Sequence, residues 1–144
     1  NSDAAVNVNL ATGVGLGGHA QGDTLVHVEN LTGSDYADTL TGSGIGNVLD
    51  GGAGADTLTG GAGPDTFVFR AGEANGDTLM DFAGAGPNAG DMLMFEGYGT
   101  IADGASFTQL DATHWQISSA DGLITDIITL ANGATIDQSD YLFG

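Results

Sequence analysis

The chain has 144 residues, 41% of them hydrophobic and none of them cysteine, which suits one domain with a modest core and excludes disulfides and thiolate metal sites. One Arg against 19 Asp and Glu gives a formal net charge of -18, which disfavours nucleic acid and anionic membrane surfaces as partners and favours a cation. We expect no membrane insertion, because no run of about 18 apolar residues occurs.

The first segment alternates between apolar and polar residues. Val6, Val8 and Leu10 alternate with asparagines, a pattern that predicts a strand with one apolar face. We therefore expect residues 1–17 to form an N-terminal strand or cap. The start at Asn1 is neither an initiator Met nor a basic-then-apolar signal peptide, and we interpret the sequence as part of a longer protein.

Four nine-residue blocks follow one another without gaps, at 33–41, 42–50, 51–59 and 60–68. Each begins with Gly, has Asp or Asn at its sixth position and has Leu or Phe at its eighth. A degenerate copy at 18–26 keeps Asp23 and Leu25 at those positions, and residues 76–82 keep Asp77 and Leu79 and add Asp81. Such a period is typical of solenoids, so we expect a repeat roll over residues 18–82.

Glycine becomes sparser after about residue 91, and strand-like segments appear at 92–95, 106–110, 114–118 and 123–130. Turn signals separate them, which predicts an antiparallel cap over residues 83–144. The sequence leaves open whether the last residues form a strand or a helical turn. Trp115 lies in an alternating segment and is expected in the core of this cap.

Each block predicts one tight turn followed by one short strand. Glycine at positions one, two and four allows turn conformations and close backbone approaches that a side chain forbids. The next three residues, such as Asp-Thr-Leu, form a strand whose leucine points inward. Two blocks then make one coil, so Asp38 lies over Asp56 on one edge and Asn47 over Asp65 on the other, roughly 4.8 Å apart.

Stacked turns of this kind form slots lined by carbonyl and carboxylate oxygens. Calcium accepts both oxygen types, whereas magnesium requires a tighter octahedron and zinc requires His or Cys. The sequence therefore predicts calcium sites, and the candidate ligands are Asp23, Gly33, Asp35, Asp38, Gly42, Gly44, Asn47, Gly51, Gly52, Ala53, Gly54, Asp56, Gly60, Gly61, Ala62, Gly63, Asp65, Asp77 and Asp81. Asp77 and Asp81 are expected to close the final slots, and Asp23, with Glu29 and Asn30, the first ones.

The blocks at 51–59 and 60–68 resemble the G-G-x-G-x-D-x-U-x repeat of repeats-in-toxin (RTX) proteins. The resemblance implies a parallel β-roll with calcium in its turns, near the C-terminus of a protein exported by type I machinery. Residues 139–144 are similar to the acidic-then-hydrophobic secretion signal of that family. Because full repeats are few and Asn47 replaces an aspartate, we expect about three to five calcium ions.

The fold class expected is all-β, a parallel β-roll (β-solenoid) of nonapeptide repeats with a C-terminal antiparallel β cap. We interpret the chain as a secreted, monomeric calcium-binding module without catalytic residues, which folds on extracellular calcium and supports type I secretion and stability of a larger protein. An alternative is a calcium-dependent polysaccharide-binding or adhesion module in which Trp115, Tyr98 and Tyr141 stack on sugars. A third reading is ice binding by Thr39, Thr41, Thr57 and Thr59.

Overall fold

The computed structural model describes residues 2–84 and 90–144. Within these residues the chain forms β-strands and two short 3₁₀ helices, η1 (Gly18–Ala20) and η2 (Ile101–Asp103), and no α-helix. None of the described residues forms a helix long and apolar enough to cross a membrane. The all-β prediction is confirmed.

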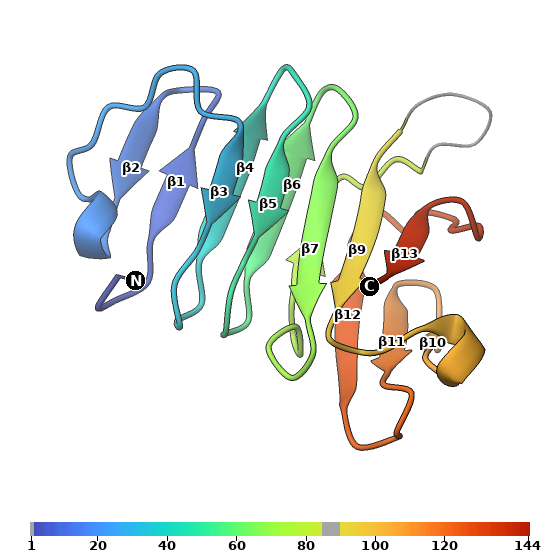
Figure 1. Ribbon diagram of the computed structural model, residues 1–144. Helices are drawn as coiled ribbons and strands as arrows, with labels where there is room; N and C mark the ends of the chain where they lie inside the picture. Colours follow the sequence, from blue (N-terminus) through green and yellow to red (C-terminus); the bar gives the residue numbers. More distant parts are fainter. Residues whose placement is uncertain (1, 85–89) are drawn as a thin grey trace.

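The strands form two sheets (Figure 1). The larger sheet contains, in spatial order, β10 (Ser106–Gln109), β11 (His114–Ser118), β12 (Thr125–Leu130), β8 (Thr78–Leu79), β6 (Thr57–Gly61), β4 (Thr39–Ser43), β1 (Asn7–Asn9) and β2 (Val14–Leu16). The smaller sheet contains β13 (Tyr141–Phe143), β9 (Met92–Glu96), β7 (Thr66–Arg70), β5 (Val48–Asp50) and β3 (Asn30–Thr32).

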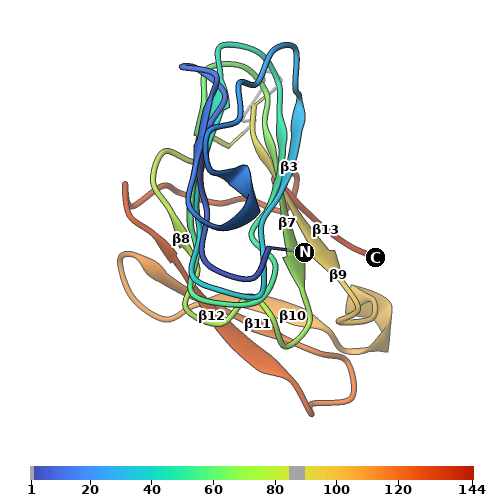
Figure 2. The same cartoon turned by 90° about the vertical axis from the view of Figure 1, so that its left-hand side faces the viewer.

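From β3 to β9 the chain alternates between the sheets, so that each pair of strands makes one coil of a roll. Figure 2, which looks onto the N-terminal end of the roll, shows the two sheets facing each other. Neighbouring strands are parallel, with Leu40 paired with Leu58 and Leu49 with Phe67. These partners are two blocks apart in sequence, which confirms the predicted parallel β-roll.

The core of the roll is a ladder of large apolar side chains at the inward-facing strand positions. Burying one such side chain fully stabilises the fold by about 1.5–3 kcal/mol. The threonines on either side of Leu40 and Leu58 are only partly buried, because successive side chains in a strand point to opposite faces. The buried ladder consists of Leu31, Leu40, Leu49, Leu58, Phe67, Leu79 and Leu93.

The N-terminal end of the roll differs from the sequence expectation. Residues 18–26 add no strand to the parallel ladder, and only Thr24 forms an isolated antiparallel bridge, with Val14. The strand beside β4 is instead β1, where Val8 pairs with Leu40, and β2 pairs antiparallel with β1. A physical reason is that His19 and Gln21 occupy the block positions at which the later turns have glycines with positive φ.

The C-terminal cap is joined to the roll through both sheets. Strands β10, β11 and β12 form an antiparallel meander, as predicted, and β12 also pairs in parallel with β8. The last residues form a strand, β13, which pairs in parallel with β9. Figure 1 shows this cap covering the end of the roll opposite the N-terminus.

Aromatic rings and a buried hydrogen bond attach the cap. The Phe95 ring centroid lies 4.8 Å from that of Phe107 and 4.9 Å from that of Phe143, and Phe107 stacks on the buried Trp115. The Tyr98 hydroxyl donates to Asp126 Oδ2 at 2.5 Å, and both residues are buried. The expected place of Trp115 in the core of the cap is confirmed.

Candidate metal sites in the turns of the roll

The turns of the roll stack along two edges. One edge carries the turns at 33–38 and 51–56 and the segment that ends at Asp77, and the other carries the turns at 42–47 and 60–65 and then Asp91. Each turn ends in an Asp or Asn that immediately precedes a strand. The strand register places equivalent turn residues of successive coils next to each other.

A ladder of carboxylates connects the coils on the first edge. The backbone N–H of Asp38 donates to Asp56 Oδ1 at 2.8 Å, and the N–H of Asp56 donates to Asp77 Oδ1 at 2.9 Å. Each carboxylate therefore uses one oxygen to hold the coil before it. All three residues are buried.

The second edge repeats this arrangement. The N–H of Asn47 donates to Asp65 Oδ1 at 2.8 Å, and the N–H of Asp65 donates to Asp91 Oδ1 at 2.9 Å. The predicted pairs Asp38 with Asp56 and Asn47 with Asp65 are thus neighbours, as the register requires.

Two carboxylate oxygens in these ladders have no partner. Asp56 Oδ2 and Asp65 Oδ2 are buried without a hydrogen bond, and each residue is only 1% exposed. A buried carboxylate oxygen without a donor is costly, because the charge has lost its water. A bound cation would remove this cost on both edges.

Backbone carbonyl oxygens of one turn closely approach the first glycine of the preceding turn on the same edge. A side chain at Gly33 would overlap the carbonyl oxygen of Gly51, and one at Gly42 would overlap that of Gly60. Glycine at position one is therefore required by the close approach of the next turn. Among residues 2–84 and 90–144, no three His, Asp or Glu side chains converge as a metal-binding group, so an ion in the turns would take carbonyl oxygens as well as carboxylates.

The close stacking predicts different costs for two glycine substitutions. Gly54 has φ 132° and its added Cβ would lie 2.7 Å from the carbonyl carbon of Tyr36, whereas Gly72 has φ 83° with nothing within 4 Å. We expect Gly72→Ala to cost about 1–2 kcal/mol from backbone strain alone, and Gly54→Ala about 2–5 kcal/mol because overpacking adds to it. Urea unfolding in saturating calcium measures both, and equal costs would contradict the stacked geometry.

Burial raises the pKa of the ladder carboxylates. Desolvation raises the pKa of Asp77 to about 8 and that of Asp56 to about 6, against the lowering effect of the backbone N–H that each accepts. The pKa values of Asp65 and Asp91 are also raised, chiefly by burial. Without an ion, these carboxyl groups therefore favour the protonated form over a range in which ordinary carboxylates are charged.

These pKa values predict that the calcium-free protein is less stable in alkali. The folded-state values of Asp77 and Asp56 lie above the ordinary value of 3.8, so their contribution is fully present below about pH 4 and is lost as the pH rises through 6 and 8. We expect the free energy of unfolding in chelator to fall by several kcal/mol between pH 5 and pH 9. Asp77→Asn, which keeps the acceptor for the Asp56 N–H, should reduce this slope; a stability that rises over this range would contradict the prediction.

Arg70, the only Lys or Arg in the chain, lies outside the ladders. Its guanidinium pairs with the buried carboxylate of Asp50, and its Nε lies 3.3 Å from Glu96 Oε2. These contacts raise the pKa of Arg70 and connect the neighbouring strands β5, β7 and β9 without an ion. The chain therefore has no lysine or second arginine with which to neutralise the ladder carboxylates.

Three further predicted ligands, Asp81, Asp23 and Asp35, lie outside the two carboxylate ladders. Asp81 does not stack over Asp65, and its two carboxylate oxygens accept from the N–H groups of Gly60 and Gly61 at 2.9 Å each. Asp91 stands over Asp65 instead. Asp23 is exposed and outside the ladders, so its assignment stays a prediction, and Asp35 is exposed in the first turn.

Sequence reasoning missed Asp91. It precedes Met92 and Leu93, so a signal was present: it repeats the Asp-x-Leu pattern of the blocks. Glu29 and Asn30, expected to help close the first slots, contribute differently. Glu29 offers its backbone carbonyl to the N–H of Val48 at 2.9 Å, and Asn30 begins strand β3.

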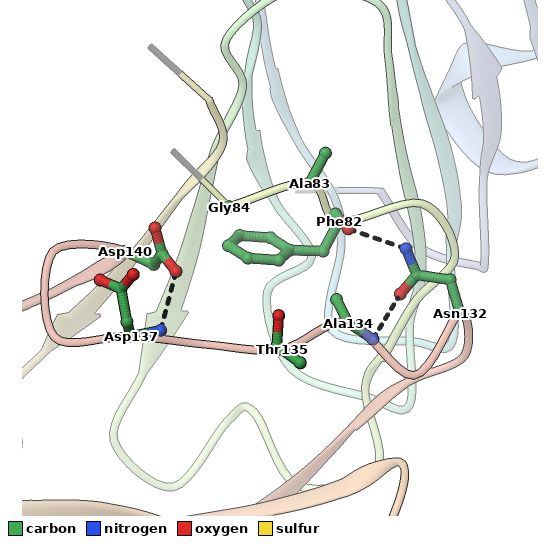
Figure 3. Close-up of a pocket in the computed structure, with 8 residues that line it drawn as sticks. All are labelled: Phe82, Ala83, Gly84, Asn132, Ala134, Thr135, Asp137 and Asp140. Carbon is green, nitrogen blue, oxygen red and sulfur yellow. Dashed lines mark hydrogen bonds between the residues drawn. The ribbon is translucent and has the colours of Figure 1, made fainter. Parts of the chain in front are cut away.

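A cavity of about 310 Å³ lies where the second edge meets the cap (Figure 3). The N–H of Asp137 donates to Asp140 Oδ2 at 2.9 Å, and Asn132 Nδ2 donates to the carbonyl of Phe82 at 2.7 Å. The Asn132 bond connects the segment after β12 to the segment after β8, whereas the Asp137–Asp140 bond lies within the C-terminal tail. The residues that line the cavity are Phe82, Ala83, Gly84, Asn132, Ala134, Thr135, Asp137 and Asp140.

A parallel β-roll with stacked acidic turns and bare buried carboxylate oxygens on both edges defines a metal-binding solenoid. Residues 32–67 match the family model of the RTX calcium-binding nonapeptide repeat, which contains four copies. Residues 32–67 therefore contain RTX calcium-binding nonapeptide repeats, and the matched repeat is a structural, non-catalytic module. No curated protein matches the chain.

Proposed function

We propose that this module folds when it meets calcium outside the cell and thereby supports type I secretion and stability of a longer secreted protein. In this account the chain has no catalytic role of its own. Where calcium is scarce, repulsion within a chain of net charge -18 keeps the roll unfolded and able to pass through an export channel. Folding of the chain outside the cell then opposes its movement back through the channel.

The observation that carries the proposal is the pair of bare oxygens, Asp56 Oδ2 and Asp65 Oδ2. Each lies in a turn of consensus sequence, buried against the glycine that opens its own turn, Gly51 or Gly60. Calcium is a hard cation that accepts carboxylate and carbonyl oxygens together, so these residues fit it. When bound, calcium would supply the charge that neutralises the ladders, and each ion bound only by the folded chain adds to its stability.

The C-terminal residues 139–144 support the export part of the proposal. They combine an acid with apolar residues, and in the folded chain they pair with β9 through β13. A recognition signal placed in this strand is fully accessible only while the roll is unfolded. Folding would therefore make the signal less accessible to the export machinery, which agrees with transport of an unfolded chain.

The alternative of polysaccharide binding receives less support. The rings suggested for stacking on sugars are occupied within the cap: Trp115 and Tyr98 are buried, and Tyr141 packs against Phe107 and Phe143. Retention on a glycan column that survives Trp115→Ala would exclude stacking on Trp115. The ice-binding reading stays a prediction, and its threonines Thr39 and Thr57 lie side by side in register.

A far-UV circular dichroism titration of the metal-stripped protein tests the proposed function. We expect a cooperative gain of β signal at about 10⁻⁴ to 10⁻³ M calcium, the range typical of extracellular modules, and a much weaker response to magnesium. A chain that is fully folded in chelator and does not respond to calcium would contradict calcium-triggered folding. Equal responses to both ions would contradict a calcium site.

A further inference from the structure

The four turns of the repeat segment are not equivalent. In the turns at 51–56 and 60–65 the second residue is glycine, with φ 88° at Gly52 and 97° at Gly61. In the first coil the same position is Ser34 or Ser43, and neither has a positive φ. The peptide at this position therefore has a different orientation in the two pairs of turns.

In the first turn, Ser34 supplies hydrogen bonds to the carboxylate of the turn's own aspartate, Asp38. Ser34 donates both its backbone N–H and its hydroxyl to the Asp38 carboxylate, the hydroxyl to Oδ1 at 3.0 Å. The N–H of Val6 in the N-terminal segment donates to the same Oδ1 at 2.7 Å. Both oxygens of Asp38 are therefore hydrogen-bonded, and Ser34 itself is buried.

The second turn has the same hydrogen-bonding arrangement, with the neutral amide of Asn47 in place of a carboxylate. Ser43 donates its N–H at 2.7 Å and its hydroxyl at 3.1 Å to Asn47 Oδ1. Asn47 Nδ2 donates to the carbonyl of Glu29 at 3.1 Å. Every polar group of this buried amide is paired, and the turn has no carboxylate at its sixth position.

The third and fourth turns lack these donors. The N–H of Gly52 donates to Asp50 Oδ1 and that of Gly61 to Asp81 Oδ2, away from the aspartates of their own turns. Glycine also has no hydroxyl to offer. Asp56 and Asp65 therefore each keep one bare oxygen.

We infer that the first coil, residues 33–47, is an ion-free end of the roll in which Ser34 and Ser43 donate the hydrogen bonds that replace a cation. Every ion bound by the repeat segment then depends on Asp56 or Asp65. The inference rests on the proposed calcium binding and specifies where it occurs. In the folded roll it also gives the N-terminal coil turns whose hydrogen bonds need no ion, and the third and fourth turns stack against this coil.

Native mass spectrometry at saturating calcium tests this by counting ions per chain. We expect Asp56→Asn and Asp65→Asn each to lose at least one ion, while Ser34→Ala and Asp38→Asn keep the wild-type number. Loss of an ion in Asp38→Asn equal to that in Asp56→Asn would overturn the inference. A wild-type chain that binds no calcium would instead refute the proposed function, so the two failures are distinguishable.

A second variant tests the inference by gain of an ion. Ser43→Gly combined with Asn47→Asp restores the consensus residues at positions two and six of the second turn and removes the hydroxyl donor. We expect the double variant to bind one ion more than the wild type, with circular dichroism confirming that it folds. An unchanged number in a folded variant would overturn the role assigned to Ser43.

Discussion

Saturating calcium is expected to raise the midpoint of thermal unfolding by about 10–20 °C. An ion at one hundred times its dissociation constant adds about 2.7 kcal/mol, and two sites, one at Asp56 and one at Asp65, together add about 5 kcal/mol. In a chain of this size, each kcal/mol shifts the midpoint by about 2–4 °C. Differential scanning calorimetry at calcium concentrations from the folding midpoint up to saturation measures the shift.

The double variant Asp56→Asn and Asp65→Asn is the matched control for this shift. Each asparagine keeps an oxygen that can accept the N–H of Asp38 or Asn47, so the ladders remain while the bare charged oxygens are removed. We expect calcium to raise its midpoint by less than half of the wild-type shift. A shift of the wild-type size in this variant would show that calcium acts elsewhere.

Phe67→Ala is expected to cost about 3–5 kcal/mol. Phe67 is fully buried in the middle of the roll, and its ring centroid lies 6.2 Å from that of Phe82. Removing the ring leaves a cavity that the stacked turns on both sides prevent from closing, since their backbones already pack at close approach. Phe67→Ala also removes the ring contact with Phe82, which lies in the segment that leads to the cap.

Urea unfolding in saturating calcium measures the Phe67 cost, with Val26→Ala as the control. Val26 is 66% exposed, so its truncation should change the free energy of unfolding by less than about 0.5 kcal/mol. Equal effects of the two substitutions would contradict a roll whose core includes Phe67.

The parallel roll was predictable because its period appears directly in the sequence. Glycine, an Asp or Asn, and a Leu or Phe recur every nine residues from Gly33 to Val68, and the strand register follows that count. Asp56 and Asp65 were found for the same reason. Their bare oxygens were not predictable, because they depend on the direction of the Gly52 and Gly61 N–H groups.

The ends of the roll were less predictable because the spacing changes there. Asp77 follows Asp56 by 21 residues and Asp91 follows Asp65 by 26, so counting by nine found the first only approximately and missed the second. At the other end, Asp23 fits the sequence pattern but lies outside the ladders, since β1 takes the place beside β4. The pairing of β13 with β9 joins distant segments and carries no local signal.

Calcium binding at Asp56 and Asp65 is tested most directly by anomalous diffraction from crystals grown in calcium. We predict one anomalous peak on each edge of the roll, about 2.3–2.6 Å from Oδ2 of Asp56 and of Asp65, with further oxygen ligands from the backbone. Ordered crystals in saturating calcium with no peak at either carboxylate would contradict calcium binding at these two residues.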